Sequence, residues 1–192
     1  MLCQRFSDAA GGADRPQSEA QWYHPALYDM DKSNTAAATQ KIEFRRVVVP
    51  AEMEALCELD RKIFHEFPAD LFIPEEWAEF ESYWMIVDGK IVGCSAFIRD
   101  SDFDDEPRPG CLHIMSTGVL PEFRRRGFGM KQKRWQIEFA KQQGFQVIVT
   151  NTRESNLAMR ELNLKLGFVI REVAPHFYYE PDEPAIVMEL QL

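Results

Sequence analysis

The residue types best suited to holding a ligand are concentrated in one stretch, Val119 to Gly129, with the sequence VLPEFRRRGFG. Three arginines, 124 to 126, stand directly before Gly127. Glycine lets the backbone come close to a ligand, the first N–H groups of a helix point outward, and the helix dipole adds partial positive charge. We predict that this stretch binds a diphosphate where a helix begins. A solvated basic helix start is the alternative.

The basic residues around this stretch contrast with the rest of the chain. The chain has 31 acidic and 22 basic residues and a formal net charge of −9. Six bases nevertheless fall within eleven residues: Arg124, Arg125, Arg126, Lys131, Lys133 and Arg134. The acidic remainder repels nucleic acid and anionic lipid, so the local cluster favours a discrete polyphosphate ligand over a nucleic-acid surface.

Two sequence patterns together resemble the GNAT superfamily of N-acetyltransferases. In that family a strand ending in Val-x-Pro precedes a loop of the form (Gln/Arg)-x-x-Gly-x-(Gly/Ala). The matching residues here are Val119, Pro121, Arg124, Gly127 and Gly129. A second family pattern, an asparagine followed by a helix and Leu-Gly-Phe, is met by Asn156 and residues 166–168. The resemblance covers about residues 42 to 191.

The resemblance implies acetyl-CoA as cosubstrate and a set of residues that bind it. The backbone of Val119 would pair with the pantetheine arm, the amides from Arg125 through Met130 would hold the diphosphate, and Asn156 would hydrogen-bond the cosubstrate. Asn156 can instead serve only as a helix cap. The full set is Thr117, Gly118, Val119, Arg124, Arg125, Arg126, Gly127, Phe128, Gly129, Met130, Asn156 and Asn163.

An amine acceptor needs a general base, because its pKa near ~10.4 leaves it protonated at pH 7. Many family members carry a carboxylate six residues before the valine, where this chain has His113. Imidazole can accept a proton directly or through a water. Strand alternation predicts that His113 shares a face with Thr117 and Val119. A structural histidine within a strand is the alternative reading.

The leaving thiolate poses a second proton problem. The family often places a tyrosine three residues before Leu-Gly-Phe, where this chain has Asn163. An amide cannot act as an acid but can donate a hydrogen bond to sulfur. Tyr178 or Tyr179 could supply the proton, since some relatives that acetylate peptide N-termini carry a tyrosine pair there. Those relatives often have glutamate at the position of Asn151, and aromatic packing is the other reading of the pair.

Acidic residues near the last two strands suggest a cationic acceptor, if they line the site. They are Glu172, Glu180, Asp182 and Glu183, together with residues 100–106. The segment of residues 65–68 and Trp77 follow the first helix, in a region that often forms the acceptor wall in this family. For the segment 65–68 and Trp77, hydrophobic support beneath the helices is the alternative interpretation.

The elements that must position these residues follow from apolar periodicity and turn residues. We predict strands at 42–49, 83–87, 91–98, 111–119, 147–149, 168–173 and 186–190, and helices at 53–64, 74–80, 127–143 and 156–166. Residues 100–110 are expected to form a solvated loop. The order β α α β β β α β α β β predicts one α/β (α+β) domain, with a mixed central sheet of about six to seven strands and flanking helices.

The remaining features bound the domain organisation. Residues 1–40 read as an N-terminal tail, flexible or docked, and residues 41–192 as the GNAT-like domain. The four cysteines and four histidines show no metal-ligand spacing, and no apolar run suits a bilayer or a secretory signal. We therefore expect a cytoplasmic protein without a metal, and a homodimer is compatible with the sequence.

The expected function is transfer of an acetyl group from acetyl-CoA to a primary amine of a small molecule or peptide. Transfer would proceed by direct attack in a ternary complex, with His113, Tyr178 and Asn163 as the candidate catalytic residues. The alternative is a non-catalytic module that senses acyl-CoA, which the replacement of the family tyrosine by Asn163 favours.

Overall fold

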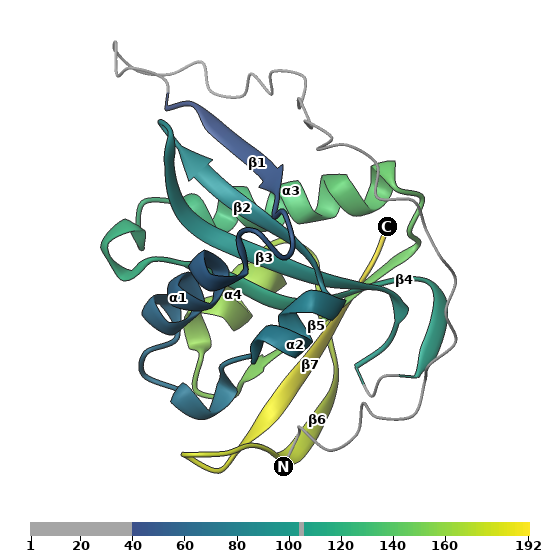
Figure 1. The fold of residues 1–192 in the computed structure, drawn as a ribbon. Coiled ribbons are helices and arrows are strands. Elements are labelled where there is room, and N and C mark those ends of the chain that lie inside the picture. The colour runs from purple at the N-terminus through teal and green to yellow at the C-terminus, as the bar shows by residue number, and fades with distance from the viewer. Residues whose placement is uncertain (1–39, 104–105) are drawn as a thin grey trace.

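A computed structural model describes residues 40–103 and 106–192, so nearly all of the expected tail lies outside the described residues. A seven-stranded sheet in the order β1-β2-β3-β4-β5-β7-β6 forms its centre (Figure 1). The strands are β1 (Ile42–Arg46), β2 (Glu81–Val87), β3 (Lys90–Ser101), β4 (Pro107–Val119), β5 (Val147–Arg153), β6 (Val169–Tyr178) and β7 (Glu183–Gln191). The mixed α/β fold expected from the sequence is confirmed.

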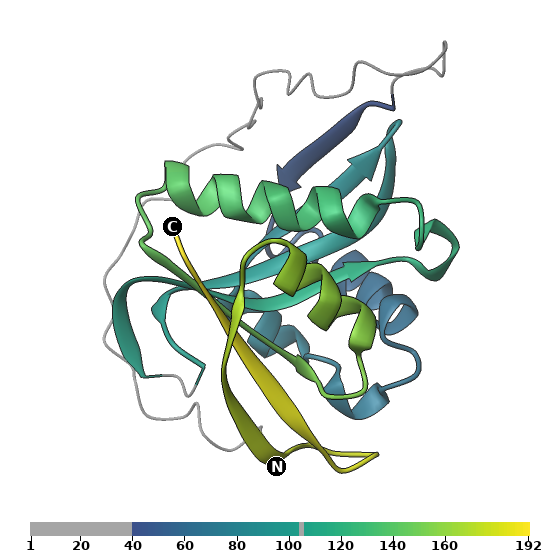
Figure 2. The same cartoon turned by 180° about the vertical axis from the view of Figure 1, so that it is seen from behind.

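Helices cover both faces of this sheet. They are α1 (Met53–Ile63), α2 (Pro74–Glu79), α3 (Phe128–Gln142) and α4 (Leu157–Lys165), with short 3-10 turns η2 (Pro68–Asp70) and η3 (Pro121–Phe123). α1 and α2 lie on one face, and α3 and α4 lie on the other (Figure 2). The element order is the one that the sequence predicts.

Each face of the sheet has its own apolar core. On the α1/α2 face, Leu56 and Trp77 are fully buried and pack with Trp84. On the α3/α4 face, the Trp135 indole stacks on the Phe44 ring with centroids 4.1 Å apart. Trp77 therefore belongs to the hydrophobic support beneath the helices.

The central strands β4 and β5 pair in parallel only over a short distance. Their register runs from Cys111 opposite Val147 to Ile114 opposite Thr150, and beyond that β4 pairs only with β3 and β5 only with β7. A bulge marks the point of separation: Ala96 pairs with Ser116 and Phe97 with Ile114, so Met115 is the extra residue. Within the described part of the chain, the backbone groups that face each other past this point have no partner strand.

The structure corrects the expected loop at 100–110. β3 extends to Ser101 and β4 begins at Pro107, so most of this segment is a continued strand pair. Arginines neutralise Asp102 in this segment: Arg108 Nη1 lies 2.8 Å and Arg171 Nη1 lies 2.6 Å from its carboxylate oxygens. The last two strands are also longer than predicted, and β6 includes Tyr178.

Lys133, expected among the surface bases, lies instead in the core between α3 and the sheet. Its side chain is 1% exposed, and its amine lies 5.7 Å from the centre of the Phe168 ring. Burial lowers the pKa of Lys133 to about 7. The cationic surface of the loop therefore does not include this residue.

Replacing this buried amine should stabilise the fold. The unfolded chain binds a proton at Lys133 below about pH 10.5, whereas the folded chain binds it only below about pH 7. Lys133→Met should therefore raise the free energy of unfolding at pH 7 by on the order of 3 kcal/mol, with a gain that vanishes near pH 10.5. Urea unfolding at several pH values measures this, with Lys165→Met on the surface of α4 as the control. Equal stability of variant and wild type at pH 7 would contradict the assignment.

Candidate functional site

The predicted diphosphate-binding turn is built around a left-handed glycine. Gly127, at φ +82°, is the N-cap residue of α3, and no side chain caps the helix. A side chain with a Cβ atom is strained in this conformation. The amides of the first helical turn, from Phe128 to Met130, have no intrahelical acceptor and point away from the helix end. The turn has the geometry that an anionic group requires.

The three arginines before this turn take different positions. Arg124 points inward: its Nη2 donates to the Ile63 carbonyl at 2.6 Å, and its Nε donates to the Val119 carbonyl at 3.2 Å. Arg125 and Arg126 are exposed, and the Arg126 guanidinium lies over the Phe123 ring. Arg124 is exposed as well, but its guanidinium is held by these two carbonyls and so anchors the turn beside α1, whereas Arg125 and Arg126 present their charge to solvent at the turn.

Residues before the turn, on β4, present backbone and not side chains to the separated edge. The Thr117 hydroxyl accepts a hydrogen bond from Gln136 Nε2 of α3 at 2.9 Å. A Cβ atom at Gly118 would collide with Ile63, so only glycine lets α1 lie this close to the strand. Phe128, predicted within the loop, is 2% exposed and packs in the core. These residues can contact a ligand through their main chain.

Helix α4 places the two predicted asparagines in different surroundings. Asn156 is exposed and caps the helix, since its Oδ1 accepts from the Met159 amide at 3.2 Å. Asn163 is fully buried; its Nδ2 lies 3.7 Å from Met188 Sδ, and its Oδ1 has no partner. The capping role of Asn156 leaves its amide N–H groups available to a ligand.

The expectation that His113 shares a face with Thr117 and Val119 is wrong. The bulge at Met115 adds one residue between them and reverses the alternation. Thr117 and Val119 face α3, whereas His113 alternates with Leu112 and Ile114, which belong to the α3-side core. His113 therefore lies on the α1/α2 face.

His113 and Tyr178 come together through Asn151. Asn151 Nδ2 donates to the Tyr178 hydroxyl at 2.9 Å. His113 is 2% exposed, and neither ring nitrogen has a hydrogen-bond partner among the residues that the structure describes. Burial lowers its pKa to about 4, opposed in part by the nearby Asn151 amide. Burial raises the pKa of Tyr178 above its ordinary value. At pH 7 the cluster therefore holds a neutral imidazole and a protonated phenol, while Asn163 lies on the opposite face.

Arg153 holds the surroundings of this cluster in place, and the sequence analysis did not identify it. Its guanidinium is 4.4 Å from the Phe67 ring centre and 4.5 Å from the Tyr178 ring centre. It forms a bidentate pair with Asp70 at 2.7 and 2.8 Å and a 2.8 Å contact with Glu183. It also donates to the carbonyls of residues 179 and 181. The only signal in the sequence is a charged residue shortly after the apolar run 147–149.

Several of the acids expected to attract a cationic acceptor are paired with basic side chains. Glu183 contacts Arg153, Asp182 contacts His176 at 2.7 Å, and Glu172 contacts Arg171 at 2.7 Å. Burial tends to raise the pKa of Glu183, but hydrogen bonds from Arg153 and Ser155 hold it below its ordinary value. The charge available to an acceptor is therefore smaller than the composition suggests.

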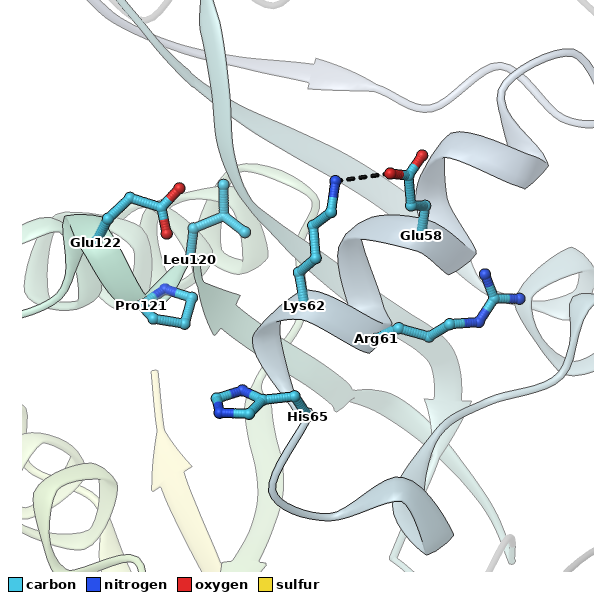
Figure 3. Close-up of a pocket in the computed structure, with 7 residues that line it drawn as sticks. All are labelled: Glu58, Arg61, Lys62, His65, Leu120, Pro121 and Glu122. Carbon is cyan, nitrogen blue, oxygen red and sulfur yellow. Dashed lines mark hydrogen bonds and ion pairs between the residues drawn. The ribbon is translucent and has the colours of Figure 1, made fainter.

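A pocket of about 480 Å³ lies beside the turn, between α1 and the end of β4 (Figure 3). Its lining is Glu58, Arg61, Lys62, His65, Leu120, Pro121 and Glu122. Lys62 and Glu58 pair across one wall at 2.6 Å. Of these residues, Pro121 belongs to the predicted loop pattern and His65 to the expected acceptor wall. Ile63 and Val119, which Arg124 bridges, adjoin the pocket in sequence.

Residues 40–103 and 106–192 contain no group of three histidine, cysteine or acidic side chains arranged to hold a metal ion. Cys57, Cys94 and Cys111 are buried free thiols. In the same part of the chain, no helix has the length and apolar character needed to cross a bilayer.

Comparisons with known proteins identify one family by sequence and a shared fold by structure. The sequence profile of the acetyltransferase (GNAT) family matches residues 53–168. No curated protein sequence matches the chain. Among solved structures, the ribosomal-protein-S18-alanine N-acetyltransferase of Escherichia coli has a TM-score of 0.65 at 18% identity, with 79% of this chain and 94% of that chain covered.

Two further solved structures contain a nucleotide thioester or its free thiol. A Bacillus subtilis acetyltransferase in complex with CoA has a TM-score of 0.63 at 20% identity, covering 80% of this chain and 99% of that one. The yncA protein of Salmonella typhimurium, with its cofactor acetyl-CoA, has a TM-score of 0.62 at 21% identity, covering 79% and 94%. At these identities the likeness shows a shared fold.

Removing the Arg153 guanidinium should strongly destabilise the site. Arg153→Met leaves the carboxylates of Asp70 and Glu183 unpaired in a largely buried setting, which costs roughly 3–5 kcal/mol. Urea unfolding measures the loss. The control Lys62→Met breaks an exposed pair with Glu58 and should cost less than about 1 kcal/mol. Similar losses in both variants would contradict the central role of Arg153.

Proposed function

The chain belongs to the GNAT acetyltransferase family, and from this we propose that it moves an acetyl group from acetyl-CoA to a primary amine by direct attack in a ternary complex. Acyl transfer is the family activity. The observation that carries the proposal is a turn with unpaired helix amides next to strands that separate, with His113, Asn151 and Tyr178 at the strands' other face.

The described residues fit acetyl-CoA as the acyl donor. The α3 amides and exposed Arg125 and Arg126 would hold the diphosphate. The β4 edge past Ile114 lacks a partner strand, so its backbone groups can pair with the amides of the pantetheine arm. The buried, unpartnered Asn163 Oδ1 supplies an acceptor on the same side of the sheet. When bound, the thioester supplies an activated acyl carbon.

The acceptor amine would approach from the α1/α2 face. There the neutral His113 imidazole can take a hydrogen bond or a proton from the nitrogen, and Asn151 holds the Tyr178 hydroxyl in place. A pKa near 4 makes His113 a weak base, since proton transfer is most effective when the pKa is close to the working pH. His113 therefore orients the amine and passes its proton onward to water.

The leaving sulfur requires less help. A thiol with a pKa of about 8.5 can depart as the thiolate near neutral pH. Asn163 can donate a hydrogen bond to it from the α3/α4 side, whereas Tyr178 lies on the acceptor side with its proton retained. We propose Tyr178 as a residue that positions the reacting groups from that side through its hydroxyl.

The proposed acceptor is a primary amine on a small molecule or peptide in which the groups next to the amine are uncharged. A polycation does not fit this description. Arg153 neutralises Asp70 and Glu183, and aromatic rings of Phe67, Phe177 and Tyr178 surround the same region. Aromatic walls favour apolar or peptide-like substituents next to the amine.

Incubation with acetyl-CoA and a panel of small amines and peptide N-termini, with thiol release measured, tests the proposal. Release above the hydrolysis blank that depends on the amine supports transfer. Stabilisation by acetyl-CoA without such release would instead support a non-catalytic acyl-CoA sensor, a reading favoured by the weak basicity of His113 and by Asn163. Absence of any interaction with CoA would overturn both.

The two roles of Asn156 can be separated by substitution. Asn156→Ser keeps a helix-capping oxygen but loses the amide N–H groups, so it should weaken acetyl-CoA binding by roughly 10-fold while barely changing stability. Asn156→Ala should lose about 1 kcal/mol of stability as well. Calorimetric titration and thermal unfolding provide the two readouts. Unchanged affinity in the serine variant would leave Asn156 as a cap alone.

His113→Gln should lower kcat by about 10²-fold and leave acetyl-CoA affinity unchanged. It should also change stability in acid: with a folded pKa near 4 against 6.5 unfolded, wild type loses stability as the pH falls from 6.5 to 4. The variant should lack about 2 kcal/mol of this loss between pH 7.5 and 5. Rate profiles and unfolding at both pH values measure the effects, with exposed His176→Gln as control. A normal kcat in His113→Gln would remove the residue from the reaction.

A further inference from the structure

The outer edge of β6 differs from an ordinary exposed strand. In the described residues β6 pairs only on one side, with β7, and forms one end of the sheet (Figure 1). Three of its large apolar side chains are exposed: Val169 at 62%, Ile170 at 46% and Val173 at 54%. Natural sheets usually protect such an edge, because its unpaired N–H and C=O groups can pair with another strand.

The opposite end of the sheet lacks this character. β1 also pairs only on one side, but none of its large apolar side chains belongs to the exposed set among described residues. Leu164, 49% exposed on α4, adds to the apolar surface on the face of the sheet to which Ile170 and Val173 belong. Of the two edge strands, only β6 therefore carries exposed large apolar side chains within the strand itself, although Val48 and Val49 are exposed just after β1.

A bulge within β6 determines which side chains share a face. Ile170 pairs with Met188 and Glu172 with Val187, so Arg171 is the extra residue. Since paired residues share a face, Ile170 and Val173 lie with Met188 and Ile186 on the α3/α4 face. Val169, Glu172 and Ala174 lie on the other face. Arg171 joins them there, since its guanidinium contacts Asp102 and Glu172.

This arrangement is self-complementary. Two copies of β6 can be placed side by side and antiparallel, related by a two-fold axis normal to the sheet. When residue 171 of one copy lies opposite residue 172 of the other, every pair of opposed side chains points to the same face of the joined sheet. Arg171 then faces Glu172 of the second copy, and Ile170 faces Val173. In a regular strand, residues 171 and 172 point to opposite faces, so this register would place opposed side chains on different faces of the sheet. The extra residue of the bulge shifts the alternation by one and removes that mismatch. Pro175, which has no amide hydrogen, ends the paired segment.

We propose that residues 169–174 of β6 form the interface of a homodimer, in which the sheets of two copies join edge to edge through two reciprocal Arg171–Glu172 pairs. The interface lies at the end of the sheet away from α1 and the turn at Gly127, so the proposal does not depend on acetyl transfer. The second copy is favoured over an unrelated partner because charge, apolar side chains and face alternation all match under the same two-fold operation.

Sedimentation velocity of the full chain from about 1 to 100 µM tests the interface, a range that detects a micromolar dimer. Wild type should shift from monomer to dimer. Arg171→Glu and Glu172→Arg should each weaken the dimer by roughly 10-fold or more, because each places like charges opposite one another at both pairs. Arg46→Glu, on the opposite edge strand, is the control and should leave dimerisation unchanged.

Mixing the two charge-reversed proteins provides the decisive experiment. One then carries two glutamates at 171–172 and the other two arginines, so a mixed dimer restores both opposite-charge pairs. The mixture should dimerise although neither protein does so alone. Hydrogen exchange of the 169–174 amides should slow as wild type associates. A wild type that stays monomeric, a dimer indifferent to both reversals, or a mixture that fails to associate would overturn the proposal.

Discussion

The short parallel contact between β4 and β5 is the constraint on which the site depends. Pairing stops at Ile114 and Thr150, and the bulge at Met115 turns β4 away while it remains bonded to β3. Backbone groups of β4 are thereby left for a ligand, and the same bulge sends His113 to one face and Thr117 to the other. One extra residue thus separates the proposed donor side from the proposed acceptor side.

Two arginines secure the segments on either side of this opening. Arg124 satisfies carbonyls of Ile63 and Val119, and Arg153 joins the segment around Asp70 to the hairpin after β6. Guanidinium groups suit this task because several donors lie in one plane and their faces stack on aromatic rings. Lys133 shows the contrast: a buried amine near Phe168 with a lowered pKa. Burial of the Lys133 amine lowers the stability of the fold, whereas hydrogen bonds, joined at Arg153 by ion pairs, offset the cost of holding the two guanidinium groups in place.

Local patterns were sufficient to predict the fold class, the element order and the turn at Gly127, because those features depend on periodicity and on residues close in sequence. They were insufficient for the side of the sheet on which His113 lies, since alternation cannot detect a bulge at Met115. Arg153 was missed because its partner Asp70 lies 83 residues away. The burial of Lys133 was missed because a basic run near a helix start is usually solvated.

The hydrogen bonds of Arg124 also tie together motions on opposite faces of the sheet. Its guanidinium caps the last carbonyl of α1 at Ile63 and holds the end of β4 at Val119, while Gly118 allows the Ile63 side chain to rest on the strand. A tilt of α1 must therefore be transmitted to the turn that leads into α3. A rearrangement of the helix on one face thereby changes the shape of the turn on the other, so under the proposed function the arrival of one substrate would alter the place prepared for the second.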